Sequence, residues 1–557
     1  MGTEGKRLMP GQGWVLALTS VVSFMVSLDT QVVATALPVI RVDLHASLAA
    51  LEWTVNAYTL SFAVLLLTGT ALGERLGRRR MLAAGTALFT AASAACALAP
   101  NAGALVAARA VQGAGAALVL PLAFALLSAG FPPQRRAWAI GIFTAVTGLG
   151  VAAGPVVGGA VAQGLAWQWI FWLNVPIGLV MIPLILTKLA PGARAAARLD
   201  PLGLVLATGG ALGLVWALIR ANSVGWASPQ IVITLVAGTV LTGAFIGWER
   251  RAAQPMVPLR LFRSRAFSAG NAACLCVFAV LYGLVFFMAQ FLQTGLGYGP
   301  LDAGLRLVPG WATLMVIAPF AGSLIRRFGE RALIAGGLTV FAGAVTWIAL
   351  IARADLPYGD MLAPLILAGA GISVAIPPTQ SVVMTAVAPA DIGKASGTFN
   401  MLRQLGGVFG IAICAAVFAA HGGYASPSSF TSGFGPAMGA CAGLALAGAV
   451  AGLVIPRRRK PVADQPGAVQ PESGAVRVPE TESARQERTA PAFVGKARVT
   501  PWAASVKRGS GDGLPAARSA MISPSSGANL APWPEQGEAT TNGPLRSRTK
   551  SSFAVHV

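Results

Sequence analysis

The chain is a succession of long apolar runs separated by short polar connections, which extends from residue 14 to residue 455. The runs are about 20 residues long, the length that an α-helix needs to cross the hydrocarbon core of a bilayer. The first run is too long for a signal peptide and is followed at once by further runs. The pattern therefore predicts fourteen membrane-spanning helices, at 14–38, 53–72, 81–99, 104–129, 139–161, 170–187, 202–219, 230–248, 267–291, 303–325, 332–352, 361–387, 397–419 and 434–455.

Two segments depart from this regular pattern. The span at 361–387 contains Pro377 and Pro378, which we expect to break or kink its helix. At Pro456 the composition changes abruptly to Pro, Ser, Gly, Ala and charged residues without sustained periodicity. Such a segment cannot bury enough apolar surface to fold, so we predict that 457–557 is a disordered, basic, cytoplasmic tail.

Composition excludes a soluble multidomain protein. Charged residues make up 11% of the 557 residues and apolar residues 55%, whereas about a quarter of an ordinary globular protein is charged. The formal net charge of +21 first suggests a nucleic-acid partner. However, the tail mixes both signs of charge and lacks interleaved aromatic residues, so we expect no nucleic-acid partner.

The positions of the basic residues explain the charge as membrane topology. If the N-terminus is cytoplasmic, the opposite side receives only Arg41, Arg220 and Arg353 from the spans and their connections. This strong asymmetry predicts an even number of spans with both termini cytoplasmic, in the cell inner membrane. The cytoplasmic clusters lie at 6–7, 75–80, 135–136, 188–198, 250–265, 326–331, 394 and 457–460.

An internal repeat predicts the fold class. Ala71–Arg79 (ALGERLGRR) follows the second span and Ser323–Arg331 (SLIRRFGER) follows the tenth. Equivalent basic turns in two halves are typical of transporters built from repeated bundles. We therefore expect an all-α polytopic membrane protein with two six-helix bundles and two additional central helices. The expected parts are a cytoplasmic N-terminus at 1–13, bundles at 14–190 and 265–456, the additional helices at 200–250, and the tail at 457–557.

Ionisable residues inside the membrane are the first candidates for function, because they are costly there. Asp29 is the only carboxylate well inside an apolar span. Removal from water disfavours its charged form, which suits reversible proton uptake near neutral pH. The alternative is that a neighbouring donor neutralises it without a role in turnover. Arg109 could pair with a carboxylate and be released on protonation, or could brace the helices permanently.

Two further motifs concern packing and switching. Gly150, Gly154, Pro155, Gly158 and Gly159 would give the fifth span a flat face for close helix packing and a kink. The turn with Glu74, Arg75, Gly77 and Arg78 could latch the cytoplasmic side through charge-assisted hydrogen bonds. The alternative for this turn is topological charge alone.

The remaining polar residues are weaker candidates. Those that could line a substrate cavity are Gln31, Asn56, Tyr58, Gln112 and Gln293, although Tyr residues near helix ends more often lie at the membrane interface. The five cysteines lie in apolar stretches, away from the three histidines, and form no Cys-x-x-Cys pair. We therefore expect no disulfide, no metal site, no cofactor and no catalytic residue.

The chain resembles the major facilitator superfamily, in its branch of fourteen-helix drug:proton antiporters, over about residues 12–456. Besides Gly150–Gly159, which is similar to the antiporter motif of exporters, the segments that carry the resemblance are Leu28–Pro38 (LDTQVVATALP), Leu105–Ala117 (LVAARAVQGAGAA), Trp167–Gly178 (WQWIFWLNVPIG), Leu199–Gly203 (LDPLG) and Gly297–Gly304 (GYGPLDAG).

The resemblance implies roles for these residues. Asp29 would take part in proton coupling, Arg109 in the proton relay, the glycine motif in limiting leak, and the turn around Glu74 in the conformational switch. The chain departs from the usual motifs at Gln31, Ala34, Thr70 and Glu74, and it carries Arg326 at an acidic position of the second turn. We therefore expect an unusual substrate contact near Gln31 and a weaker second latch.

The predicted function is proton-coupled export of hydrophobic or cationic small molecules, such as drugs or antibiotics, by a monomer in the lipid bilayer. With one embedded carboxylate, neutral or weakly charged compounds are favoured. The alternatives are a proton-linked importer of a metabolite on the same scaffold, which the glycine motif disfavours, and a polytopic membrane enzyme. Such enzymes usually cluster His, Asp or Glu at one membrane face, and the sequence has no such cluster.

Overall fold

The computed structural model describes residues 11–191, 200–252, 255–317, 320–388 and 391–456. These residues belong to one compact unit and are helical nearly throughout, with no β-strand in the described ranges. The predicted tail at 457–557 and most of the predicted N-terminal segment lie outside the described residues. The all-α fold class is confirmed.

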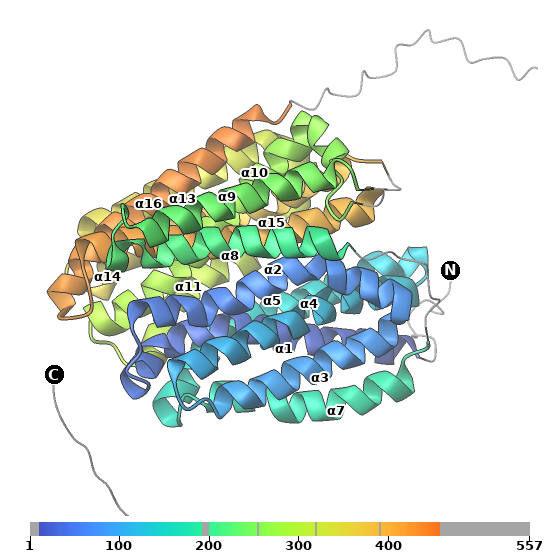
Figure 1. The fold of residues 1–557 in the computed structure, drawn as a ribbon, viewed down its shortest axis with the longest axis horizontal. Coiled ribbons are helices and arrows are strands. Elements are labelled where there is room, and N and C mark those ends of the chain that lie inside the picture. Colours follow the sequence, from blue (N-terminus) through green and yellow to red (C-terminus); the bar gives the residue numbers. More distant parts are fainter. Residues whose placement is uncertain (1–10, 192–199, 253–254, 318–319, 389–390, 457–557) are drawn as a thin grey trace, which may run out of the picture. The chain divides into compact units, whose positions relative to one another are not determined.

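The first half of the unit is a bundle of six spans (Figure 1). Its second helix packs on its fourth, its first on its fifth, and its third on its fourth and last. The last span consists of the short α6 and the longer α7, which follow each other directly. The bounds are α1 Gln12–Asp43, α2 Leu48–Leu76, α3 Arg78–Ala97, α4 Ala102–Gly130, α5 Pro133–Gly164, α6 Trp169–Trp172 and α7 Asn174–Lys188.

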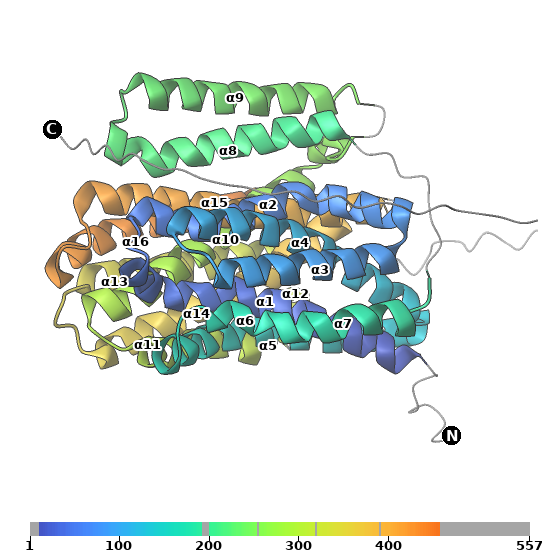
Figure 2. The same ribbon diagram turned by 60° about the horizontal axis from the view of Figure 1, so that its bottom comes forward.

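Two helices, α8 Pro201–Val224 and α9 Pro229–Glu249, form a pair on the outside of the bundles (Figure 2). The second bundle contains α10 Arg265–Gln290 with its π-helical continuation η3 Phe291–Gly295, which follows the short η2 Leu259–Arg263. Its remaining helices are α11 Pro300–Ile317, α12 Ala321–Phe328, α13 Glu330–Ile351, α14 Tyr358–Thr385, α15 Ile392–His421 and α16 Pro427–Val454.

The predicted spans are recovered with one correction. Thirteen helices among the described residues are long and apolar enough to cross a bilayer, and α11 with α12 would make the fourteenth span. The prediction of one continuous helix at 303–325 is wrong, because α11 and α12 meet at an angle of 67°. The sequence carries Pro319 between them, and proline lacks the N–H donor that a continuing helix needs.

Helix α14 does not break at Pro377 and Pro378, and the alternative that they kink the helix stays a prediction. Helix α14 continues through both residues from Tyr358 to Thr385. Adjacent prolines leave the preceding carbonyl groups without helical donors, and a helix inside a bundle can tolerate this loss where neighbouring helices support it. Here α13 and α11 pack along α14, so packing overrides the local preference.

The internal repeat is recovered as two equivalent helix junctions. Gly77 separates α2 from α3 with a φ of 103°, and Gly329 separates α12 from α13 with a φ of 77°. Such positive φ angles favour glycine. Both basic turns are therefore single-residue junctions between consecutive helices rather than extended loops.

The two bundles contact each other mainly along two helix pairs. Helix α5 packs on α11, and α2 packs on α15. At the first of these contacts a Cβ atom built on Gly304 would overlap the Pro155 carbonyl oxygen. Backbones can approach this closely only where side chains are absent.

The crossing of α13 and α14 gives a test of this packing. A Cβ atom on Gly337 would lie 2.6 Å from the Gly371 carbonyl oxygen, whereas one on Gly343 of the same helix has no described neighbour within 4 Å. Gly337→Ala should therefore destabilise the protein by about 1–3 kcal/mol through overpacking. Thermal unfolding in detergent should show a lower Tm for Gly337→Ala and an unchanged or higher Tm for Gly343→Ala; equal Tm values for the two variants would contradict the packing.

Candidate functional site

Asp29 and Arg109 form a buried ion pair between α1 and α4. The Arg109 Nη1 atom lies 2.6 Å from Asp29 Oδ2, and each residue is 1% exposed. The sequence indicated both residues separately, and the structure brings them together. Because a buried charge needs a partner, removing one member of such a pair costs roughly 3–5 kcal/mol.

Two amide side chains complete the coordination of the carboxylate. Gln112 Nε2 and Asn174 Nδ2 each donate to Asp29 Oδ1 at 2.9 Å. The same two amide nitrogens donate to Ser93 Oγ, at 2.8 and 2.9 Å. The Asp29 carboxylate thus joins α1 to α4 and α7, and the two amide groups extend the network to Ser93 of α3. We call Asp29, Ser93, Arg109, Gln112 and Asn174 the carboxylate cluster.

The guanidinium group is also held from several sides. Arg109 Nη1 donates to Gln112 Oε1 at 2.6 Å, and Arg109 Nε donates to the Thr54 carbonyl oxygen of α2 at 3.2 Å. The Tyr58 ring lies under the guanidinium group, 4.1 Å from ring centroid to Cζ. A protonated Asp29 would lose its ionic attraction to Arg109, so its charge state bears directly on contacts that reach α2.

Sequence reasoning missed two members of the cluster. Ser93 and Asn174 are ordinary small polar residues within apolar helices, and they became significant only when folding placed them beside Asp29. Asn174 begins α7, just after the short α6. A polar residue at such a break within an apolar span was the one feature of the sequence that could have identified it. Tyr58 and Gln112, which were predicted to line a substrate cavity, contact Arg109.

The other residues that were predicted to line a substrate cavity are buried or half-buried, and each has its own surroundings. Gln293 Nε2 donates to the Thr35 carbonyl oxygen at 2.8 Å and so connects the two bundles. Asn56 is fully buried in α2, and both of its amide atoms lack a hydrogen-bond partner among the described residues. Gln31 is buried in α1 beneath Gly154.

The glycine motif of α5 faces two different helices. A Cβ atom on Gly150 would lie 2.9 Å from the Phe24 carbonyl oxygen of α1, and one on Gly158 would overlap the carbonyl oxygen of Val32. On Gly159 it would instead overlap the Pro300 carbonyl oxygen of the second bundle. The motif therefore brings α5 into close contact with both α1 and α11. Pro155 of the same motif contributes to the contact with α11, because its carbonyl oxygen faces Gly304.

The predicted switch turn makes its contacts at helix ends. Glu74 and Arg78 form a half-exposed pair at 3.9 Å across the Gly77 junction. Next to them, Arg79 Nη1 donates to the Leu189 carbonyl oxygen, which follows α7, at 3.0 Å. Arg75 lies in the last turn of α2. A half-exposed ion pair of this length contributes little to stability.

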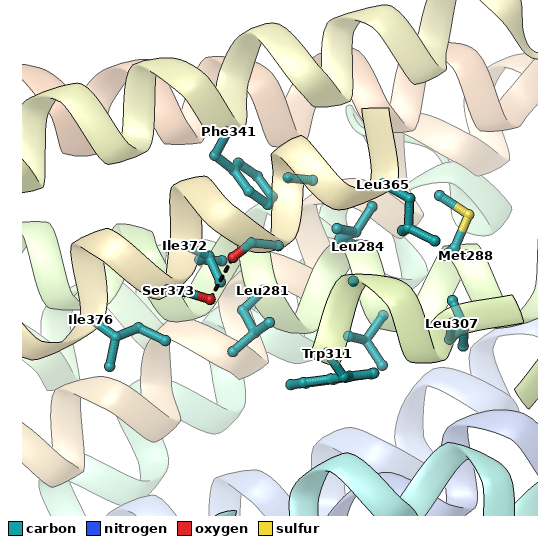
Figure 3. A pocket seen from close by; sticks show the side chains of 14 residues that line it. Leu281, Leu284, Met288, Leu307, Trp311, Phe341, Leu365, Ile372, Ser373 and Ile376 are labelled. Carbon is teal, nitrogen blue, oxygen red and sulfur yellow. Dashed lines mark hydrogen bonds between the residues drawn. The ribbon is translucent and has the colours of Figure 1, made fainter. Parts of the chain in front are cut away.

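An apolar cavity lies inside the second bundle, between α10, α11, α13 and α14 (Figure 3). Leu284, Met288, Trp311, Phe341 and Leu365 are among the side chains around it, and Ser373 supplies a hydroxyl group. The Ser373 hydroxyl already donates to the Gly369 carbonyl oxygen at 2.6 Å. The cavity is therefore suited to apolar groups. Within the described ranges, no group of three His, Cys, Asp or Glu residues could hold a metal ion.

Comparison with known proteins agrees with this architecture. The family model described as Major Facilitator Superfamily matches residues 19–411. The tetracenomycin C resistance and export protein of Streptomyces glaucescens is 35% identical over 433 residues, 77% of this chain and 80% of that protein. The cephamycin export protein CmcT of Amycolatopsis lactamdurans is 37% identical over 447 residues, 79% of this chain and 92% of that protein.

Solved transporter structures share the fold. The crystal structure of the POT family transporter PepTSo superimposes with a TM-score of 0.61 at 14% identity, covering 81% of this chain and 98% of that chain. The crystal structure of the peptide transporter POT in complex with sulfate gives a TM-score of 0.59 at 17% identity, with 82% and 95% of the two chains covered.

The carboxylate cluster predicts energetic coupling between Asn174 and Asp29. Asn174→Ala leaves the carboxylate with one donor fewer and should destabilise the protein by about 1–3 kcal/mol. In an Asp29→Asn background the same substitution should cost less, because the charge-assisted hydrogen bond is already lost. Thermal unfolding of the four proteins measures the coupling.

A matched control for this cycle is Asn400→Ala, because Asn400 Nδ2 donates to the Ser396 carbonyl oxygen within its own helix. Its cost should be the same in the unmodified protein and in the Asp29→Asn background. Equal costs of Asn174→Ala in the two backgrounds would contradict the coupling.

Proposed function

The chain belongs to the Major Facilitator Superfamily, and on this premise we propose that it is a proton-coupled exporter of hydrophobic or cationic small molecules. The relatives at about 35% identity are named as exporters of antibiotics and other drugs. The protein is a multi-pass membrane transporter, and its substrates are drug-like compounds of the kind that these names describe. We place it in the cytoplasmic membrane as a monomer, with both termini cytoplasmic.

The observation that carries proton coupling is the carboxylate cluster. Asp29 is buried at the centre of hydrogen bonds from residues of other helices, so its protonation alters contacts throughout the first bundle. In the cycle that we propose, binding of a proton to Asp29 weakens its attraction to Arg109. Arg109 also holds the Thr54 carbonyl oxygen of α2, and α2 contacts α15 of the second bundle. The carboxyl group is thereby coupled to the contact between the bundles.

Export then follows by alternating access, in which the two bundles rock about a central pathway. The close contact between Gly159 and Pro300 supports a role for the glycine motif in sealing this pathway against leak. The Gly77 junction, where Glu74 and Arg78 pair weakly, is suited to rearrange during the switch. The apolar cavity of the second bundle is suited to the apolar part of a substrate.

Loss of the Asp29 charge should abolish transport that is driven by a pH gradient. In inverted vesicles with an imposed gradient, Asp29→Asn should reduce accumulation of a lipophilic fluorescent dye by at least about tenfold, equivalent to about 1.4 kcal/mol. Proton movement that depends on the dye should be lost in parallel.

The control is Asp302→Asn, because Asp302 is half-exposed and pairs with Arg306 one turn further along its own helix. This variant should transport as well as the unmodified protein. If Asp29→Asn also does so, Asp29 has no role in proton coupling.

A further inference from the structure

A second carboxyl group is buried outside the carboxylate cluster, near the beginning of α2. Glu52 is 2% exposed, and its Oε2 atom has no hydrogen-bond partner in the part of the chain that the structure describes. It lies in the second turn of the helix, after Leu48. Asp29, in contrast, accepts hydrogen bonds at both of its oxygen atoms. The surroundings of Glu52 therefore do not stabilise a negative charge as those of Asp29 do.

Two ionisable groups, one from each bundle, meet at this end of the bundles. Arg41, at the end of α1, places its guanidinium Cζ 4.2 Å from the centre of the Tyr424 ring. Tyr424 lies in the connection between α15 and α16, and its hydroxyl group donates to Gln290 Oε1 at the end of α10. Burial raises the pKa of the Tyr424 phenol; a negative charge on Glu52 raises it further, and Arg41 lowers it. Glu52 lies at the same end of the first bundle as Arg41, since only residues 44–47 separate α1 from α2.

These residues lie where the two bundles meet at one membrane face. Helices α1 and α10 both end there, and α2 and α11 begin there. Besides the contact of Arg41 with Tyr424, Gln293 Nε2 bonds the Thr35 carbonyl oxygen at 2.8 Å, and the Leu301 N–H bonds Gln163 Oε1 at 3.0 Å. We call the contacts of Arg41 and Gln290 with Tyr424, together with the buried Glu52 near the adjoining start of α2, the outer seal. The name reflects that this face is extracellular in the topology proposed above.

An ionised Glu52 would be costly within the outer seal. A buried carboxylate oxygen without a donor, such as Glu52 Oε2, loses its hydration and has no hydrogen bond to replace it. Arg41 directs its guanidinium group over the Tyr424 ring instead of neutralising Glu52, and its Nε atom also lacks a partner within the described ranges. When the bundles separate at this face, water can solvate the carboxyl group and its charged form becomes accessible.

We propose that Glu52 is a second proton-binding site, which binds a proton from the extracellular side when the outer seal closes and returns it to that side when the seal opens. This inference rests on the proposed topology. The proton enters and leaves at the same membrane face, so it adds nothing to the transport stoichiometry. Its effect is to make closure of the outer seal depend on extracellular pH.

The sign of this dependence follows from linkage. The closed seal holds one proton more than the open seal, so acid favours closure. The ordinary pKa of glutamic acid is about 4.3. Above this pH, each rise of one pH unit should lower the equilibrium constant for closure of the seal by at most about tenfold, which is the limit for one linked proton.

Other titratable groups near this face need controls. His45 and His421 are exposed, and Asp43 accepts a hydrogen bond from Trp167 Nε1. Deeper in the membrane, Arg109 bonds the Thr54 carbonyl oxygen, two residues beyond Glu52, and is itself paired with Asp29. Histidine is the side chain that most often makes a protein sensitive to pH, so both histidines serve as controls.

Hydrogen–deuterium exchange of the full chain in lipid nanodiscs tests the proposal without a transport assay. Protection of the amide groups around Tyr424 is measured between about pH 5 and pH 8. Because the intrinsic exchange rate of an unprotected amide depends on pH, the labelling time at each pH is adjusted to give the same intrinsic exchange. Protection should fall as pH rises in the unmodified protein. Glu52→Gln, which is neutral at every pH, should remain protected throughout, whereas Glu52→Asp should retain the fall.

The controls separate this site from the other groups. His45→Gln, His421→Gln and Asp29→Asn should each retain the fall in protection. Persistence of the fall in Glu52→Gln, or its absence from the unmodified protein, would overturn the proposal. If Asp29→Asn transports normally while Glu52→Gln removes the pH dependence, the proposed coupling at Asp29 fails and the second site stands.

Discussion

The first bundle is organised around the Asp29 carboxylate, whose negative charge must be compensated inside an apolar environment. Asp29 is buried in the first bundle, where a carboxylate is costly unless protein groups replace its hydration. Four helices therefore contribute to a single cluster, with Arg109 as the countercharge and Gln112 and Asn174 as further donors. The apolar packing around it excludes water, and the cluster in turn fixes how α1, α3, α4 and α7 lie against one another.

Elsewhere the bundles are held by close backbone contact. Because lipid is as apolar as the helix surfaces, the hydrophobic effect gives little preference for one helix contact over another within the bilayer. Glycines supply the specificity at the contacts of α5 with α1 and α11, where carbonyl oxygens occupy the space of a side chain. Contacts of this kind do not depend on directional side-chain bonds.

Much of the fold was predictable from the sequence, because span length and the distribution of Arg and Lys are set by the bilayer itself. The break between α11 and α12 was not predicted, and α14 passes through Pro377 and Pro378 without one. Pro319 accompanies the break between α11 and α12, whereas α14, against which α11 and α13 pack, continues through its two prolines. The site was predictable in part: Asp29 and Arg109 are conspicuous as charges in apolar spans. Ser93 and Asn174 gain their role only from three-dimensional proximity, and the surroundings of Glu52 are set by residues far from it in sequence.

The outer helix pair has a mechanical consequence. Helix α8 packs on α2 of the first bundle and on α15 of the second, whereas α9 packs mainly on α8. Asn222 of α8 also donates a hydrogen bond to the Ala416 carbonyl oxygen of α15, so α8 is attached more firmly to the second bundle. In the alternating access proposed above, α8 and α9 should therefore travel with the second bundle and slide past α2.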